Sequence, residues 1–308
     1  MQLLRYAQEA PSRLGVLRPQ SDVLAAITGL LRPAATEILD VLADVGPDRP
    51  VAVIGDGFSR SLPWPAVPIG QNEHIVDRIS WVHEPTLELI RTEPTPVPRL
   101  TAVLDGDRGH TLRWAKEESS WIVKRRHGLT FDPDVDNQIG TDPFLLHACA
   151  HGIADPVDPR QSGLVVHNTF TDTPLFLRAS DLVALNAVPT MMVLSACSMG
   201  HAGLTWEASA MASPVTDTFR ASGVAAVTSY LSPCSDRSAF VLSTYLHYRL
   251  EGGATLEEAV RSTQLWAKRS SDRELRSWVT SNTTIETLSD PALLRRAGTW
   301  GTLSVSGW

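Results

Sequence analysis

Short apolar runs, each closed by turn residues, alternate with amphipathic helical patterns along the chain, and this alternation constrains the fold most strongly. Strands are predicted within 48–57, 78–84, 99–107, 143–150, 190–197 and 223–231. Capped helical patterns follow or separate them at 111–126, 213–222, 235–253 and 255–270. Strands that alternate with helices predict an α/β protein whose central sheet is mostly parallel and covered on both faces.

Shorter signals complete the predicted order of elements. Two helices are expected at the start, over 21–31 and 33–46, because the second pattern begins on Pro33 and stops at Gly46. Further elements are expected at 85–92 and 180–185 as helices and at 162–166, 174–178 and 300–308 as strands. The Pro-rich stretch 91–99 predicts a stiff connector rather than a long linker between independent domains.

Composition excludes several classes of protein. The 308 residues contain 27 Lys and Arg against 34 Asp and Glu, a formal charge of −7, which argues against a broad nucleic-acid surface. No apolar stretch approaches the ~18 residues of a membrane span, and no signal peptide is recognisable, so neither a membrane nor nucleic acid is an expected partner. Three cysteines in a chain of this length do not form a disulfide framework, and a reducing, cytoplasmic setting is expected.

Two predicted strands end in reactive side chains. The strand at 143–150 leads into His151 and Gly152, and the strand at 190–197 ends in Ala196 and Cys197. Active sites of open parallel sheets lie beyond the carboxyl ends of strands, so neighbouring strands would bring His151 and Cys197 to one edge. A thiol beside an imidazole is a nucleophile with its base. The backbone N–H groups of Gly152 and Cys197 could form an oxyanion hole.

Each of these signals also has a structural interpretation. A free cysteine that ends an apolar strand is usually inert packing, and a His-Gly pair usually just begins a loop. His147 and His151 have the spacing of a helical metal site, but on a strand they would lie about 13 Å apart, too far for one ion. We therefore predict no metal site and no cofactor, and we interpret His147 as a core histidine with a hydrogen-bonded ring. The "GDGFSR" stretch at Gly55 is too short for a nucleotide-binding loop.

Several segments together resemble one family. In order and spacing, "LLHACAHG", "SDLVAL", "MMVLSACSMG", "ASGVAAVTSYLSPCSDRSAFVLSTYLHYRL" and "TLEEAVRSTQLWAKR" resemble the CHAT domain, a caspase-like cysteine peptidase of the group that includes caspases, separase and gingipains. The resemblance implies a caspase-like three-layer α/β/α sandwich, with His151 as the catalytic histidine and Cys197 as the nucleophile. It also implies that residues 1–139 form the N-terminal helices and a pseudo-caspase-like half, and that residues 140–308 form the catalytic half.

The resemblance further implies a regulated endopeptidase that cuts a protein substrate, in bacterial defence, signalling or cell death, under an activating or recruiting protein partner. Loop residues near both strand ends include Asp155, Ser162, Trp206, Glu207 and Asp236, of which Asp155 and Glu207 are the candidates for substrate binding. An acidic pocket would favour Lys or Arg before the scissile bond, a basic pocket Asp, and an apolar pocket Leu or Met.

Two other functions stay open on sequence grounds. The chain could be a catalytically silent interaction module with the same fold, although such a module needs neither the His-Gly nor the Ala-Cys pair. It could also be a thiol hydrolase or transferase that acts on small molecules rather than on peptide bonds.

Overall fold

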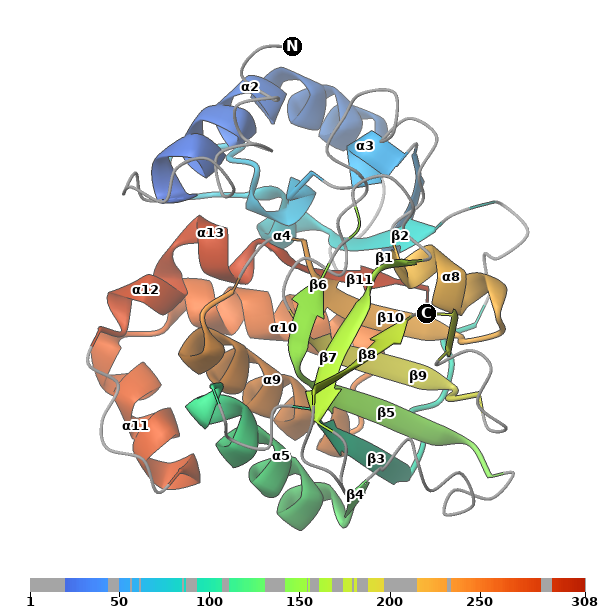
Figure 1. The fold of residues 1–308 in the computed structure, drawn as a ribbon. Coiled ribbons are helices and arrows are strands. Elements are labelled where there is room, and N and C mark those ends of the chain that lie inside the picture. Colours follow the sequence, from blue (N-terminus) through green and yellow to red (C-terminus); the bar gives the residue numbers. More distant parts are fainter. Residues whose placement is uncertain are drawn as a thin grey trace.

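The structure, a computed structural model, is an α/β protein whose largest element is a mostly parallel sheet (Figure 1). It describes residues 20–43, 50–55, 57–60, 62–84, 86, 93–106, 111–130, 142–153, 155, 161–167, 174–178, 180–181, 188–196, 215–231, 234–283 and 290–307. The predicted helices at 85–92 and 180–185, apart from residues 86, 180 and 181, and the site residues Cys197 and Glu207 lie outside these ranges.

The central sheet has eight strands in the order β1-β2-β11-β10-β9-β5-β3-β4. Their bounds are β1 Pro50–Ile54, β2 Ser80–Glu84, β3 Leu100–Asp105, β4 Leu129–Thr130, β5 Phe144–Cys149, β9 Met191–Ser195, β10 Ala226–Tyr230 and β11 Leu303–Ser306. Within this sheet only β10 and β11 pair antiparallel, and every other neighbouring pair is parallel. The predicted α/β class and mostly parallel sheet are therefore confirmed.

One face of the sheet is covered by helices. The covering helices are α5 Arg113–Arg126, α9 Asp236–Glu251 and α10 Leu256–Arg269, with α11 Asp272–Asn282 packed outside them. Leu145 and Val193 point to this face and join Leu246 and Val260 in one buried cluster. Because successive strand residues point to opposite faces, the neighbours of Leu145 and Val193 in sequence point to the other face of the sheet.

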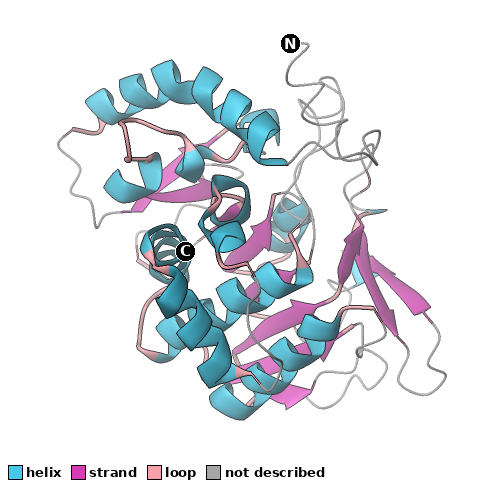
Figure 2. Ribbon diagram, turned by 90° about the vertical axis from the view of Figure 1, so that its left-hand side faces the viewer, coloured by secondary structure: helices cyan, strands magenta, loops and turns pink. Residues whose placement is uncertain are grey.

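The other face is covered by α8, Val215–Ala221, and by a separate three-stranded antiparallel sheet. That small sheet contains β6 His151–Ile153, β7 Gly163–His167 and β8 Pro174–Arg178, and it lies to one side of the main sheet in Figure 2. Leu146 and Met192 of the main sheet pack here with Leu164 and Phe219. This packing accounts for the near-continuous apolar runs of the central strands, which are buried on both faces.

The His-Gly pair differs from the sequence expectation. The strand before it ends at Cys149, and His151 begins β6, which pairs with β7 and so belongs to the small sheet rather than to the central one. The chain changes sheets at Ala150, which is buried. His151 therefore lies at the junction of the two sheets, beyond the carboxyl end of β5.

The first helix also differs from expectation. Residues Gln20–Val41 form one helix, α2, with Pro33 inside it, where two helices were predicted. Proline removes a backbone donor, and its ring crowds the carbonyl four residues earlier, which here belongs to Gly29. The Thr36 hydroxyl donates to the Arg32 carbonyl at 3.0 Å, so a side chain bonds the backbone near this interruption. Tertiary packing against Ala35 thus overrides a local stop signal.

Several further elements are short: α3 Gly57–Arg60, η1 Trp64–Ala66, α4 Ile75–Arg78, α12 Ala292–Arg295 and α13 Ala297–Trp300. Of these, η1 and α13 contact α2. Ala35 of α2, Ile75 and the stacked pair Trp64 and Trp81 form a buried cluster above β1 and β2. No helix within the described ranges has the length and apolar character needed to cross a membrane.

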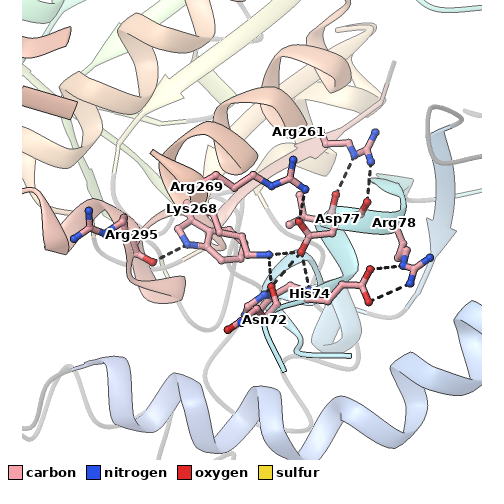
Figure 3. A network of polar contacts seen from close by, with 11 residues as sticks. Asn72, His74, Asp77, Arg78, Arg261, Lys268, Arg269 and Arg295 are labelled. Carbon is pink, nitrogen blue, oxygen red and sulfur yellow. Dashed lines mark hydrogen bonds and ion pairs between the residues drawn. The ribbon is translucent and has the colours of Figure 1, made fainter. Parts of the chain in front are cut away.

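A polar network fixes α4 to the end of α10 (Figure 3). Asp77 accepts hydrogen bonds from Arg269 at 2.7 Å and from the His74 backbone at 2.8 Å, and it is ion-paired with Lys268. Arg261 donates to the Val76 carbonyl at 3.0 Å. Burial alone would raise the pKa of Asp77, but the hydrogen bonds from Lys268, His74 and Arg269 outweigh it and lower that pKa. The network holds the segment before β2 against the helical layer.

Candidate active site

His151 is the exposed histidine at the junction of the two sheets. Its Nε2 atom lies 2.6 Å from the Thr111 hydroxyl oxygen, a short hydrogen bond whose direction depends on the imidazole tautomer. Thr111 lies in the segment between β3 and α5, and its side chain reaches the end of β5. The imidazole is thus accessible, and one of its nitrogens is held by a side chain.

The strand that leads to Cys197 is the direct neighbour of the strand that leads to His151. β5 and β9 pair in parallel from Leu145 opposite Met191 to Cys149 opposite Ser195. The backbone contact continues one step further, since the Ala150 N–H lies 3.4 Å from the Ser195 carbonyl oxygen. The prediction that both strands end at one edge of the sheet is confirmed. Cys197 itself follows Ala196, the last described residue of this segment.

A pocket opens at this edge. His151 and Ala196 both line it, from the end of β5 and the end of β9 respectively. Tyr230 contributes a wall from the end of β10, and Asp236 one from the first residue of α9. His151 and the residue before the predicted nucleophile therefore share one concave site, as expected for the carboxyl edge of a parallel sheet.

Comparison with known protein families identifies the family of this chain. Residues 25–286 match the CHAT domain family. The chain belongs to that family. No curated sequence matches it.

Solved structures of similar fold extend the comparison. This CHAT domain is similar to separase in two crystal structures of the Saccharomyces cerevisiae separase–securin complex, with a TM-score of 0.51 in each. Sequence identity is 9% and 11%, and 84% of the present chain is covered in both. The matched region is only 15% and 16% of those separase chains. At this identity the likeness shows a shared fold.

A cysteine thiol lines the pocket of the CHAT domain. Cys234 is a partly exposed cysteine located just before α9. Sequence reasoning assigned it no role, because a single cysteine after an apolar strand carries no spacing signal. Cys149, by contrast, is fully buried, and burial together with the nearby Glu118 carboxylate raises the pKa of its thiol well above the ordinary value. Cys149 is therefore a neutral thiol and a poor nucleophile.

A buried polar chain lies beneath the pocket. His147 is fully buried, with Nε2 2.9 Å from Glu118 Oε1 and Nδ1 3.0 Å from His247 Nε2. The interpretation of His147 as a hydrogen-bonded core histidine is confirmed. Burial lowers the pKa of His247 well below its ordinary value, assisted by His147 and Arg126, so His247 is neutral. The direction of its hydrogen bond with His147 depends on the tautomers of the two rings.

Glu118, His147 and Cys149 also form the one group of possible metal ligands found among the described residues. One donor atom from each lies within 4.8 Å of the others. Yet the single Nε2 of His147 already lies 2.9 Å from the glutamate oxygen and 3.0 Å from the Cys149 sulfur. These contacts are hydrogen-bond distances, shorter than the separation of two ligand atoms around a tetrahedral ion, about 3.3 Å or more. The group fits a hydrogen-bonded core cluster better than a metal site.

The remaining predicted residues have different positions. Gly152 is half-buried in β6, opposite Leu164. Asp155 lies after β6 with its backbone N–H bonded to the Ser162 hydroxyl at 2.9 Å, and it is not among the residues that line the pocket. Glu207 and Trp206 lie outside the described residues.

Glu118 was missed although the sequence carried a signal for it. The buried side of α5 contains Trp114, Ala115, Glu118, Ser119 and Ile122. A carboxylate in the apolar stripe of an amphipathic helix needs a buried partner, since an unpaired buried charge is costly. The partner, His147, is on a strand, and no local pattern could have indicated that pairing.

Proposed function

We propose that this CHAT domain is a cysteine endopeptidase in which Cys197 is the nucleophile and His151 the acid–base residue. One observation carries the proposal: His151 and Ala196, the residue before Cys197, line a single pocket at the ends of two paired strands. An exposed imidazole beside a thiol is the combination that thiol hydrolases require. Membership of a caspase-like peptidase family supports the same chemistry.

The proposed reaction is acyl transfer. The Cys197 thiolate attacks the peptide carbonyl carbon, a C–S bond forms, and the C–N bond breaks as His151 delivers a proton to the leaving amine. Water then attacks the thioester, His151 accepts its proton, and the free acid and the thiolate are restored. The N–H groups of Gly152 and Cys197 are the proposed donors to the oxyanion. The Thr111 hydroxyl holds the ring of His151 during both proton transfers.

The biological setting is proposed by analogy. The similar separase chains were crystallised with securin, a protein partner. We propose that a protein partner likewise recruits or activates this domain, and that its substrate is another protein. Action in bacterial defence, signalling or cell death rests on the family resemblance alone.

Cleavage of a diverse peptide library tests the proposal. Wild-type protein should cut peptides, and Cys197→Ala should not. Cys149→Ala is the matched thiol control: it removes a buried, neutral thiol outside the pocket, so cleavage should persist once a melting curve has shown that the variant is folded. Equal cleavage by wild type and Cys197→Ala would remove Cys197 from the reaction.

If Cys197→Ala still cuts, Cys234→Ala is the next variant to test, because Cys234 is the cysteine among the described residues that lines the pocket. If Cys197→Ala cuts and Cys234→Ala does not, Cys234 is the nucleophile and the pocket still belongs to a thiol peptidase. If neither single variant nor wild type cuts any peptide, with or without cell extract as a source of the activating partner, the silent interaction module becomes the better description.

A further inference from the structure

The ends of α5 and α9 that point away from the active-site pocket enclose a second concave surface. Ala115 and Asp236 line the pocket near the first turns of these helices, whereas Arg126 and Glu251, their last residues, line a hollow at the other end. The helices have 14 and 16 residues. At about 1.5 Å per residue, this surface therefore lies roughly 20 Å from the pocket.

Several hollows adjoin one another here. Three of them, with volumes of about 620, 280 and 530 Å³, share Arg125 and Glu251 in their walls. They extend from the Pro-rich segment 94–99, past the ends of α5 and α9, to residues 281–283, where α11 ends. We call the three hollows together the basic groove.

The charge of the basic groove is opposite to that of the chain, whose formal charge is −7. The described lining of the groove has two carboxylates, Glu117 and Glu251, and five cations, which are Arg99, Lys124, Arg125, Arg126 and Arg249. Arg99, Lys124 and Arg249 form no ion pair with any described residue, and the Nε atom of Arg249 has no hydrogen-bond partner among them. These three cations are available to an anionic partner.

A fourth cation can change partners. Arg125 Nε lies 2.6 Å from Glu251 Oε2, but the two side chains are 47% and 40% exposed. An exposed ion pair contributes little to stability, because water and salt screen it and both side chains lose freedom. A carboxylate from another protein can therefore take the place of Glu251 at small cost.

Another wall of the basic groove is stiff. Pro94, Pro96 and Pro98 line it, and each proline fixes its own φ angle. Arg126 donates to the Pro98 carbonyl at 3.1 Å and to the Thr101 hydroxyl at 3.3 Å, which ties this wall to the end of α5. The groove is thus preformed, and binding would order mainly the incoming chain.

A simpler role for the cations is to complement the helix dipoles. Lys124, Arg125 and Arg126 lie in the last turn of α5, and Arg249 lies in the last turn of α9. The dipoles do not explain Arg99, which precedes β3 and belongs to no helix. They also do not explain why unpaired cations border three joined hollows.

We infer that the basic groove is a docking surface for an extended acidic segment of a partner protein. Three joined hollows suit a chain of several residues better than a single small anion. Trp121 and Tyr248 line the groove beside the cations, and aromatic residues and arginine are enriched in protein interfaces. Nucleic acid is less suited, because the negative charge of the chain repels a long polyanion more than a short acidic peptide. The surface is remote from the proposed active site, so the inference does not depend on the peptidase function.

Selection from a random peptide library tests the inference. Linear peptides displayed on phage are selected on immobilised protein that carries Cys197→Ala, so that peptidase activity cannot remove them. The recovered peptides should be enriched in Asp and Glu by about 3-fold or more over the library. Selection on the same protein with Arg99→Gln, Lys124→Gln and Arg249→Gln should lose this enrichment. Peptides without acidic enrichment, or enrichment that survives in this triple variant, would overturn the inference.

Arg32→Gln, Lys116→Gln and Arg273→Gln together form the matched control. These residues are exposed and do not line the basic groove, and the control removes the same kinds and number of charges. A melting curve first shows that both triple variants are folded. The control should keep the acidic enrichment. Its loss in the control as well would reduce the effect to net charge and overturn the docking surface.

Affinity measurements separate an acidic peptide from other anions. The most enriched peptide, made with a fluorophore, is compared by fluorescence anisotropy with a version in which amides replace all its side-chain carboxylates. The acidic form should bind about 10-fold or more tightly than the amide form, lose about 10-fold or more in the groove variant, and weaken as salt rises. A labelled single-stranded RNA of mixed sequence is the rival probe. Tighter binding of RNA than of the peptide, lost in the groove variant, would assign the surface to nucleic acid and overturn the inference.

Discussion

Two histidines four residues apart occupy opposite environments. His147 is fully buried between Glu118 and His247, while His151 is exposed and touches the Thr111 hydroxyl. Both follow the same apolar run in the sequence. The difference shows that the same side chain serves two purposes on either side of the end of β5. Inside the sheet, the imidazole of His147 is hydrogen-bonded to the buried carboxylate of Glu118. Beyond the sheet, the imidazole of His151 is exposed and accessible to a substrate.

The strongest test of this division is His151→Ala. If the peptidase proposal holds, kcat/KM should fall by about 10²–10⁴-fold, the usual contribution of a general acid–base residue. The free energy of unfolding should change by no more than about 0.5 kcal/mol, because the side chain is exposed. Peptide cleavage and urea unfolding measure the two quantities. A large loss of stability with intact activity would reverse the assigned roles of the two histidines.

The complementary test is His147→Leu. It should lower the free energy of unfolding by about 3–5 kcal/mol, because the Glu118 carboxylate stays buried without its partner. The double variant with Glu118→Leu should recover much of this loss, since an apolar pair avoids the burial of charge. Urea denaturation of both single variants and the double variant gives the coupling energy. Additive losses would show that the contact contributes little.

Acid should destabilise the protein through histidines that stay neutral when folded. Burial, with a smaller effect of Arg60, lowers the pKa of His83 to about 3, and neither ring nitrogen has a hydrogen-bond partner among the described residues. Below the unfolded pKa of about 6.5, His83 is protonated in the unfolded chain but stays neutral in the folded chain. The contribution of His83 to the free energy of unfolding is therefore complete above that pH, and it declines as the pH falls toward 3.

At pH 5 the loss from His83 should be about 2 kcal/mol relative to pH 7.5, and His83→Leu should remove that share of the pH dependence. Urea unfolding at the two pH values measures it. An identical slope in wild type and His83→Leu would mean that His83 is protonated in the folded protein as well.

The smallest expected effect belongs to Thr111→Val. This change removes the hydroxyl that holds His151 Nε2 but keeps the branched shape. We expect kcat/KM to fall by about 10-fold or less, since a hydrogen bond of this kind contributes about 1 kcal/mol. Thr111→Ser keeps the hydroxyl and should restore the wild-type kcat/KM. An unchanged kcat/KM in Thr111→Val would remove the positioning role.

The sequence allowed the strand pairing at the site to be predicted because it depends on patterns that act locally. Apolar runs, turns and caps located β5 and β9, and the rules for parallel sheets placed their ends together. The continuation of α2 through Pro33 could not be predicted, because packing against distant residues decided it. The position of Glu118 at the pocket could not be predicted either, because it depends on how α5 crosses the sheet. Asp236 was expected near both strand ends, and it does line the pocket.

The position of β11 has a consequence for how the molecule is made. β1 and β2 join the rest of the central sheet only through β11, by the pairing of Ser306 with His83 and the Gly307 N–H bond to the His83 carbonyl at 3.1 Å. Among the described strands β11 leaves the ribosome last. During synthesis, β1 and β2 therefore cannot pair with the rest of the sheet until β11 has been made. Until then the edge of β2 is open to pairing with other chains. A growing chain is most exposed to aggregation during that interval, and a nascent-chain chaperone would be most useful then.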